Sequence, residues 1–548
     1  MKKLFIITIS ILISNSLWLS GQAQYLDYKL MSARIESFGR SYPSLCKTRS
    51  IVKSAGGRDI WLITIGTGDT DNKPGITITG GTEGSHILGT MLALGVAEKL
   101  IENRDSSRIK KLLEEVTFYI LPDVSPDATE QYFSGMKYER HVNSRPVDDD
   151  RDFLIDEDPC EDLNGDGLIT LIRIKDPSGT YIENSEDKRI MTPADLSKGE
   201  TGQYLVYSEG IDNDGDERFN EDGPGGVNFN RNFSFDYEEF GSGSGLYPVS
   251  EPETKAVADF LFDRFNIYAV FSFGPQDNLG QPMKAPESPG EAQGRQEGSG
   301  RRERGPVTSI MKSDEVVNKL VSDKYHELTG LKGAPSAGPA HGNFMEWAYF
   351  HYGRYSFGTP GWWFPVEKGK SREVAFLKFA DRNNMKDVFI PWTKIDHPGF
   401  PGKEVEVGGI RPFVMDNPPA DSVGNLIDSH FRFISAVAEM HPALEFLDVT
   451  TENAGGDLFR LSLKVHNRGT FATCTAIGDQ LLWTRIPGLS LDLSKNQTIE
   501  SGTKVQRISR LQGGECSEYN WLIRGKGRVG INAGAVNTGF VNSTVDLK

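Results

Sequence analysis

A carboxylate and an imidazole stand three residues apart in the segment Gly-Gly-Thr-Glu-Gly-Ser-His, residues 80–86. Glu83 and His86 follow a short apolar run, 74–79, and precede a longer one, 87–100, whose length and composition are typical of a helix. Carboxylate oxygens and imidazole nitrogens are both zinc ligands, and the end of a strand is a frequent place for a binding site. The spacing therefore predicts half of a metal site.

A second candidate for metal binding is an acidic insertion, 141–226, which is rich in Gly and Asn. Acidic or amide side chains recur there every second residue in three short runs. Oxygens at positions 1, 3 and 5 of a tight loop converge on a hard cation, and Ca²⁺ takes six to eight of them. Gly167 and Gly215 would allow the turns, although the second run lacks the Glu at position twelve of a full EF-hand loop. The spacing predicts a structural calcium site made by Asp148, Asp150, Asp152, Asp162, Asn164, Asp166, Asp212, Asp214 and Asp216.

The size and charge of the chain limit the classes of protein to which it can belong. A chain of 548 residues needs more than one hydrophobic core, so two or three domains are expected. The net charge of −16 argues against a nucleic-acid partner, which needs a basic surface. Four cysteines are too few for a disulfide framework, and Cys474 with Cys516 is the plausible pair because both lie in the last segment.

The N-terminus is typical of a secretory signal, residues 1–23. Lys2 and Lys3 precede the apolar run 4–19, and small residues follow up to an expected cleavage point near Ala23. The run is interrupted by Ser and Asn, which favours a cleaved signal over a membrane anchor. We therefore expect an exported protein, periplasmic or extracellular, with no membrane span.

Strands and helices alternate along residues 24–440, which predicts an α/β domain with a mixed central sheet flanked by helices. A second interruption, 284–306, has almost no apolar residues and is expected to be a disordered loop. Residues 441–548 contain short alternating segments between Gly and Asn turns, which predicts an all-β sandwich domain. The expected strands are 61–66, 75–79, 116–122 and 267–273, and the expected helices are 87–103, 252–264, 314–328 and 424–440.

Five stretches within the α/β part resemble the zinc carboxypeptidase family, and they occur in the family's order. They are SAGGRDIWLITIG (54–66), LPDVSPDA (121–128), GVNFNRNF (226–233), SEPET (250–254) and NFMEWAYFHYGRYSF (343–357). The resemblance is to carboxypeptidase A/T-like metallopeptidases of a secreted bacterial type. It implies the carboxypeptidase-like fold, zinc as the cofactor and a peptide C-terminus as the ligand.

The resemblance also implies a set of substrate-binding residues. Asn230 and Arg231 match the family's Asn-Arg pair, which grips the terminal carboxylate of the substrate, as a guanidinium can do with two parallel hydrogen bonds. Tyr349 corresponds to the tyrosine that caps the substrate. An arginine that polarises the scissile carbonyl corresponds to Arg145 or Arg140.

The zinc and general-base positions of the family are altered in this chain. The family holds zinc with a His, a Glu three residues later and a second His at a strand end. Glu83 and His86 have these ligand types in exchanged order, and Gly274 stands at the third position. Two protein ligands rarely hold zinc, whose catalytic sites use three and a water. Pro360 stands where the family has the general-base Glu, and a proline side chain cannot accept a proton.

The residues that grip a carboxylate are thus present, whereas the third zinc ligand and the base are not. We expect a zinc carboxypeptidase-family protein that binds the C-terminus of a peptide or of a peptidoglycan stem and is inactive or impaired in hydrolysis. Two alternatives remain open. One is an active metallocarboxypeptidase with a rearranged zinc site, to which Asp277 or Gln276 would contribute through a moved loop. The other is a non-enzymatic exported scaffold.

Overall fold

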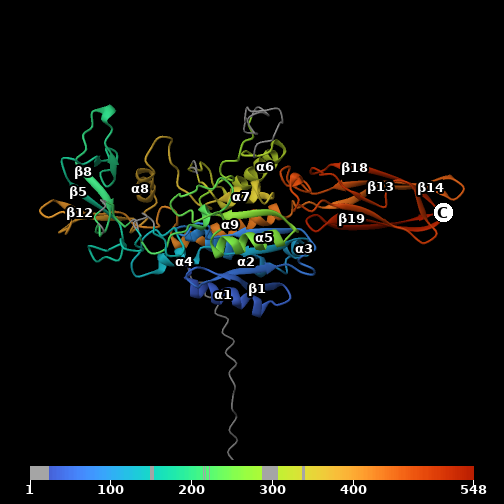
Figure 1. Ribbon diagram of the computed structural model, residues 1–548, viewed down its shortest axis with the longest axis horizontal. Coiled ribbons are helices and arrows are strands. Elements are labelled where there is room, and N and C mark those ends of the chain that lie inside the picture. The colour runs from blue at the N-terminus through green and yellow to red at the C-terminus, as the bar shows by residue number, and fades with distance from the viewer. Residues whose placement is uncertain are drawn as a thin grey trace, which may run out of the picture.

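The structure, a computed structural model, describes residues 24–148, 153–213, 215, 218–220, 223–286, 307–335, 338 and 340–548. An α/β domain lies in the middle, an antiparallel sheet lies at one end and a β-sandwich at the other (Figure 1). The expected signal segment and residues 287–306 of the expected disordered loop lie outside the described residues. No helix in the described part of the chain is long and apolar enough to cross a membrane.

The central sheet has six strands in the order β1-β2-β4-β3-β9-β10. The strand β3 pairs in parallel with both β4 and β9, whereas β1 and β2 are antiparallel, so the sheet is mixed, as predicted. Every residue of β3, β4 and β9 is buried, because helices cover both faces of the sheet. The strands are β1 (Cys46–Lys53), β2 (Asp59–Ile65), β3 (Gly75–Thr79), β4 (Thr117–Leu121), β9 (Ile267–Phe273) and β10 (Tyr355–Thr359).

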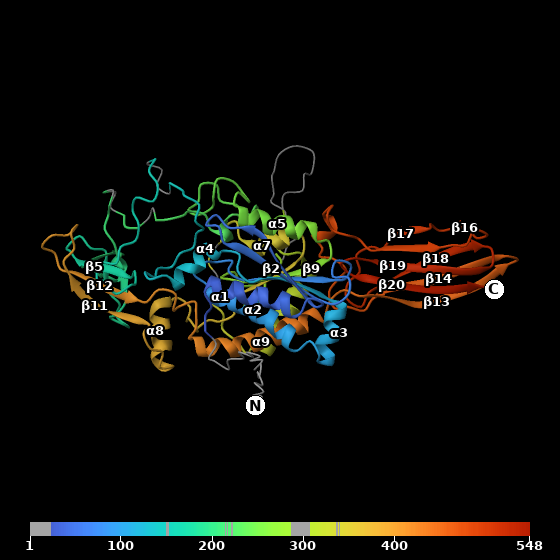
Figure 2. The same ribbon diagram turned by 90° about the horizontal axis from the view of Figure 1, so that it is seen from below.

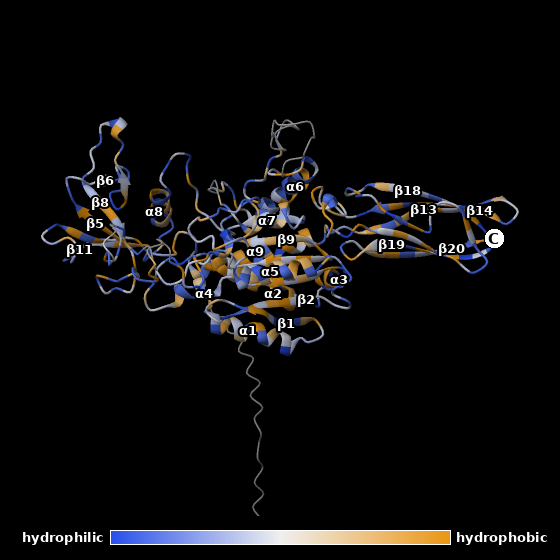
Figure 3. Ribbon diagram, in the orientation of Figure 1, coloured by the Kyte–Doolittle hydropathy of each residue, from blue (hydrophilic) through white to orange (hydrophobic). Residues whose placement is uncertain are grey.

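Two hydrophobic cores lie on the two faces of this sheet (Figures 2 and 3). Residues of α1, α2, α3, α6 and α9 fill the core on one face, and residues of α5 and α7 fill the core on the other. The four expected helices correspond to α2, α5, α6 and α9, and the predicted α/β fold class is confirmed. The helices are α1 (Tyr28–Ser41), α2 (Ile87–Glu102), α3 (Ser107–Glu115), α5 (Pro252–Asp263), α6 (Lys312–Thr329), α7 (Phe344–Phe350) and α9 (Ala420–Ala438).

The acidic insertion forms most of a second, antiparallel sheet of order β11-β12-β5-β8-β6-β7. Four of its strands, β5 to β8, come from the insertion, and two, β11 and β12, come from a segment far along the chain. The two groups meet where β5 pairs with β12, with Ile174 opposite Val405. Their apolar side chains form a small core of their own. The sequence prediction missed this sheet, because its short strands find partners in a distant part of the chain. The strands are β5 (Leu171–Lys175), β6 (Tyr181–Glu183), β7 (Met191–Pro193), β8 (Tyr204–Ser208), β11 (Phe389–Ile395) and β12 (Val405–Ile410); α8 (Arg372–Arg382) lies beside them.

The C-terminal part is all-β, as predicted, with two antiparallel sheets of order β13-β14-β18-β16 and β17-β15-β19-β20 that enclose Trp521 and other apolar residues. The expected pairing of Cys474 with Cys516 is wrong in this structure, since all four cysteines have free thiols. Trp483 does not lie in a strand; its indole N–H donates to the carbonyl of Tyr352 in the α/β domain. The strands are β13 (Leu444–Gly455), β14 (Leu458–Asn467), β15 (Gly488–Asp492), β16 (Thr498–Ser501), β17 (Val505–Arg507), β18 (Cys516–Arg524), β19 (Gly527–Ala535) and β20 (Gly539–Leu547).

Candidate functional site

Glu83 lies in the loop that joins β3 to α2, at the carboxyl end of the parallel strands. Its carboxylate, 15% exposed, accepts a hydrogen bond from Nδ1 of His141 at 2.8 Å and another from Nδ2 of Asn228 at 3.2 Å. Burial lowers the pKa of His141, but the hydrogen bond to Glu83 and the charges of Glu83 and Glu139 more than offset this, so the pKa is raised. The carboxylate expected to bind a metal is therefore held in an ion pair with a protein side chain.

His86 is buried at the start of α2. Its Nε2 atom is 2.9 Å from the backbone carbonyl of Pro360. A carbonyl can only accept, so Nε2 carries the hydrogen and donates it. Nδ1 is buried and forms no hydrogen bond within the described residues. Burial is the main cause that lowers the pKa of His86, so the imidazole is neutral at physiological pH.

These residues do not fit a zinc ion held in the family's manner. The Nε2 atom of His86 is occupied by Pro360, and Gly274 supplies no side chain. A Cβ atom on Gly274 would overlap the hydroxyl of Thr82, so a larger residue here would require that side chain to move. Within the described residues, no group of three or more His, Cys, Asp or Glu side chains is placed to hold a metal ion. Catalytic zinc sites need three protein ligands, and we derive no metal-dependent step.

Asn230 and Arg231 do meet Glu83 at one cavity of about 270 Å³, which we call the carboxylate compartment. Both residues belong to a short 3₁₀ helix, Phe229–Arg231, whose preceding Asn228 accepts from the N–H of Asn230 at 2.7 Å. The amide of Asn230 is engaged by the protein, donating to Gln276 and accepting from a backbone N–H of α7. The guanidinium of Arg231 is exposed and donates through Nη1 to the carbonyl of Ser242 at 2.9 Å. Its remaining N–H groups leave it able to bind an anion.

Two other residues expected to bind substrate lie elsewhere. Tyr349 is buried; its hydroxyl donates to Asp314 at 2.9 Å and accepts from the N–H of Met311 at 3.0 Å. The Nε of Arg145 donates to the buried carboxylate of Glu251 at 2.7 Å. Neither residue lines the carboxylate compartment. In this structure both side chains are engaged in the packing of the protein itself.

Arg140, the alternative to Arg145, donates to the carbonyls of Val142 and Asn143. It lines a large cavity of about 690 Å³ between the α/β domain and the second sheet, together with His141, Arg189, Trp392 and Arg411. This cavity contains neither Asn230 nor Arg231. We therefore locate the candidate site in the smaller carboxylate compartment.

The residues expected to bind calcium are described only in part. Asp150, Asp152, Asp214 and Asp216 lie outside the described residues. In the second run, Asp162 accepts backbone N–H groups of Gly165 at 2.8 Å and Gly167 at 2.7 Å, and Asp166 and Asn164 make similar turns. Asp148 accepts the N–H of Phe153 at 3.0 Å, and Asp212 that of Gly215 at 2.6 Å. In these loops the side-chain oxygens accept backbone N–H groups of their own turns, and the calcium site stays a prediction.

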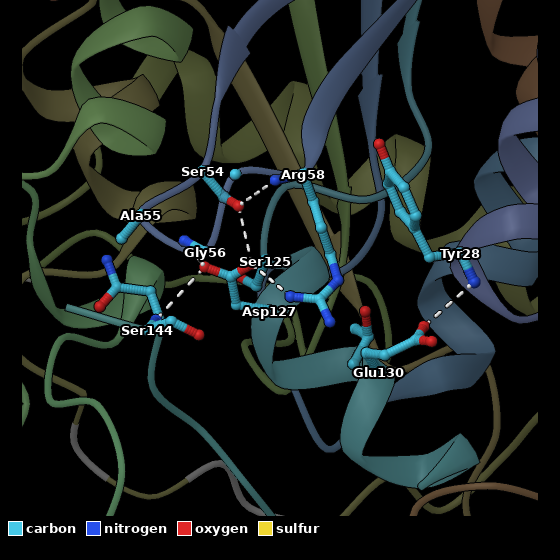
Figure 4. Close-up of polar contacts among 12 residues, drawn as sticks. Tyr28, Ser54, Ala55, Gly56, Arg58, Ser125, Asp127, Glu130 and Ser144 are labelled. Atoms are coloured by element: carbon cyan, nitrogen blue, oxygen red, sulfur yellow. Dashed lines mark hydrogen bonds and ion pairs between the residues drawn. The ribbon is translucent and has the colours of Figure 1, made fainter.

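Asp127 holds the loop before β2 against the start of α4 (Pro126–Thr129) (Figure 4). Its buried carboxylate accepts from Ser54 Oγ at 2.7 Å, from the N–H of Gly56 at 2.7 Å, from Arg58 Nη1 at 2.9 Å and from the N–H of Ser144 at 3.3 Å. The segment 121–128, one of those that resemble the family, thus has a structural role here. Through the N–H of Ser144 it also holds the chain just after His141.

Two residues of this region were missed by reasoning from the sequence. His141 is 58 residues from Glu83 and pairs with it, and His341 lines the carboxylate compartment. Gln276, named from the sequence only as a possible zinc ligand, lines the same compartment. His141 directly follows Arg140, one of the two candidate arginines. This position in the sequence could have identified His141 as a residue near the site.

Comparisons with known proteins find similarity in two parts of the chain. Residues 31–167 match the model of the zinc carboxypeptidase family, and residues 443–546 match the model of a domain of unknown function. Over 120 residues, 22% of this chain, the sequence is 28% identical to carboxypeptidase B of Astacus astacus. Residues 31–167 of this chain are thus similar to the zinc carboxypeptidase family. The chain is also 29% identical over 136 residues, 24% of its length, to carboxypeptidase D of Anas platyrhynchos.

These matches span 39% of the length of the carboxypeptidase B and 10% of that of the carboxypeptidase D. Among solved structures, carboxypeptidase A from Helicoverpa armigera aligns over 76% of this chain and 74% of its own, with 13% identity and a TM-score of 0.41. The chain therefore spans well under half of the length of the carboxypeptidase B and of the carboxypeptidase D, and its own activity and ligands have to be argued from its residues.

Proposed function

We propose that this carboxypeptidase-family protein binds the C-termini of peptides through Arg231 without hydrolysing them efficiently. The observation that carries the proposal is the contrast within one cavity: the guanidinium of Arg231 is exposed in it, whereas Glu83 is paired with His141. A guanidinium binds a carboxylate with charge-assisted hydrogen bonds. The groups needed for hydrolysis are missing, because Gly274 supplies no zinc ligand and Pro360 supplies no general base.

Calorimetric titration with pairs of peptides that differ only in a free or an amidated C-terminus tests the binding. We expect the free carboxylate to bind more tightly, and Arg231→Gln to weaken that binding by about 10- to 100-fold, since hydrogen bonds to charged groups are worth about 1.5–3 kcal/mol. Arg411→Gln is the matched control, because Arg411 lines the other cavity. Equal binding of both peptides, or an Arg231→Gln protein that binds as well as the wild type, would show that the proposal is wrong.

Metal analysis separates this proposal from an active metallocarboxypeptidase. Protein stripped with a chelator and reloaded with zinc is expected to retain less than one zinc per chain and to release no C-terminal residues. Stoichiometric zinc together with hydrolysis, both lost in Glu83→Gln, would establish the active enzyme instead. The pairing of Glu83 with His141 is what makes Glu83 the informative position.

We also propose that the acidic insertion binds calcium for structural purposes. The support is the repeated spacing and the tight turns at Asp162 and Asp212. Calcium bound only by the folded protein must stabilise it, so a chelator is expected to lower the melting temperature and Ca²⁺, but not Mg²⁺, to restore it. A melting temperature that does not respond to the chelator would exclude this role.

Export to the periplasm or beyond, with cleavage near Ala23, is the remaining part of the proposal. The support is the basic start and short apolar run of residues 1–23. An exported protein would meet secreted peptides and peptidoglycan stems, both of which end in free carboxylates. Mass spectrometry of the mature N-terminus and fractionation of cells test this; a cytoplasmic, uncleaved chain would contradict it.

A further inference from the structure

Tyr349, which the resemblance assigns to the ligand, is joined to the C-terminal part of the chain by one buried carboxylate. Its hydroxyl donates to Oδ2 of Asp314 in α6 at 2.9 Å. The carboxylate of Asp314 also accepts the backbone N–H of Ala476 at 2.8 Å and an N–H of Arg510 at 2.9 Å. The side chain of Asp314 is 1% exposed and that of Arg510 is 13% exposed. Removing one partner of such a buried ion pair leaves an uncompensated charge, so this link between α7 and the β-sandwich is strong.

The chain just after α7 is held by the same part of the protein. The carbonyl of Tyr352 accepts from the indole N–H of Trp483 at 3.0 Å. The carbonyl of Gly353 accepts from the hydroxyl of Thr475 at 2.8 Å. The carboxyl end of α7 is therefore fixed by side chains that follow β14 in the C-terminal part.

The amino end of α7 holds the segment that carries Arg231. The N–H of Phe344, the first residue of α7, donates to Oδ1 of Asn230 at 3.0 Å. The N–H of Phe233 donates to the carbonyl of Gly342 at 2.9 Å, so the chain is held on both sides of Arg231. A helix of seven residues is about 10 Å long. One short, buried helix thus connects the β-sandwich to the carboxylate compartment.

We propose that Tyr349, Asp314 and Arg510 are positioning residues of the carboxylate compartment, through which the β-sandwich holds Arg231 in place. The inference rests on the proposed function, because Arg231 is the residue taken to bind the ligand. The exposed guanidinium of Arg231 donates to the carbonyl of Ser242, and its place otherwise depends on the backbone that carries it. A site whose groups are already fixed loses less conformational entropy when a ligand binds, and therefore binds it more tightly.

A double-variant cycle tests this by calorimetric titration with acetylated trialanine, with either a free or an amidated C-terminus. Tyr349→Phe removes the hydroxyl and keeps the ring, and Arg510→Gln removes the charge. Each is expected to weaken the binding of the free C-terminus about two- to tenfold. The double variant is expected to weaken it by less than the product of the two factors, because both changes act on Asp314. If Tyr349 contacted the peptide itself, the two factors would multiply.

Arg524→Gln is the matched control. Arg524 is also ion-paired, with Glu500 at 2.8 Å, but this pair lies within the β-sandwich and is exposed. This variant is expected to keep the wild-type affinity. Circular dichroism of each variant establishes that it is folded. If Arg510→Gln does not fold, Tyr349→Phe carries the test by itself.

Hydrogen exchange of the Phe344 amide is a readout that needs no peptide. A purely structural role of the ion pair would loosen only the carboxyl end of α7, where the contacts are lost. We expect faster exchange at Phe344 in Arg510→Gln and in Tyr349→Phe, because the loosening reaches the bond to Asn230. Arg524→Gln is expected to exchange at the wild-type rate.

Wild-type affinity in Arg510→Gln and Tyr349→Phe, or factors that multiply, would overturn this inference alone as long as binding still depends on Arg231. If no peptide binds, or if binding is independent of Arg231, the proposed function fails. The exchange at Phe344 then decides the inference. A faster rate in the two variants supports the positioning of this segment, and an unchanged rate overturns it.

Discussion

Replacing Asp127 with asparagine tests how the loop before β2 is held. The carboxylate is buried, with each oxygen accepting two hydrogen bonds, and Arg58 is its ionic partner at 2.9 Å. The asparagine amide would keep one acceptor oxygen but turn an N–H₂ group towards two donors. Hydrogen bonds to charged groups are worth about 1.5–3 kcal/mol each, and breaking a buried ion pair costs about 3–5 kcal/mol. Arg58 is 31% exposed, so the loss of its ion pair costs an energy near the low end of that range. The bond from Ser144 is long, 3.3 Å, so the loss of this hydrogen bond is small as well. We expect Asp127→Asn to destabilise the α/β domain by about 3–4 kcal/mol.

Urea unfolding monitored by hydrogen exchange of residues 54–58 measures this loss of stability. The exchange rates report on this loop even if the several domains unfold in separate steps. Asp59→Asn is the matched control in the same hairpin. Asp59 also bonds two side chains, Ser50 and Lys53, but it is only partly buried and Lys53 is 64% exposed, and ion pairs of this kind contribute less than about 1 kcal/mol. Equal destabilisation by the two variants would refute the argument that burial makes the Asp127 contacts strong.

Two further predictions concern the neighbourhood of the cleft. Burial raises the pKa of Asp123 to about 7, so the folded state retains a proton that the unfolded state loses near pH 4; stability is therefore expected to fall by about 3–4 kcal/mol between pH 4 and pH 7 and then level off. Asp123→Asn should remove this slope in unfolding measurements across that range, and an unchanged slope would assign it to other groups. Gly274→Ala should cost about 1–3 kcal/mol, because its Cβ overlaps the Thr82 hydroxyl. Adding Thr82→Ala should recover most of this loss in thermal melts; a double variant no more stable than Gly274→Ala would contradict the proposed overlap.

Much of the central domain could be predicted from local patterns in the sequence. The β3 run GITIT is continuous and apolar, as is typical of a strand buried on both faces, and α2, α5, α6 and α9 begin and end within a few residues of their expected bounds. The second sheet could not be predicted in the same way. Its strands have few residues each, and the pairing of β5 with β12 depends on contacts between distant segments.

In the candidate site, too, some features could be predicted from the sequence and others could not. The resemblance predicted that Asn230 and Arg231 bind the ligand. It also put Gly274 at the position of the third zinc ligand and Pro360 at that of the base, and a side chain that is absent cannot act whatever the fold. Only the tertiary structure decided the partners of the remaining groups. It pairs Glu83 with His141 and turns the Nε2 atom of His86 to the carbonyl of Pro360. Hydrogen-bond partners are selected by position in space, and these partners lie 58 and 274 residues apart in the chain.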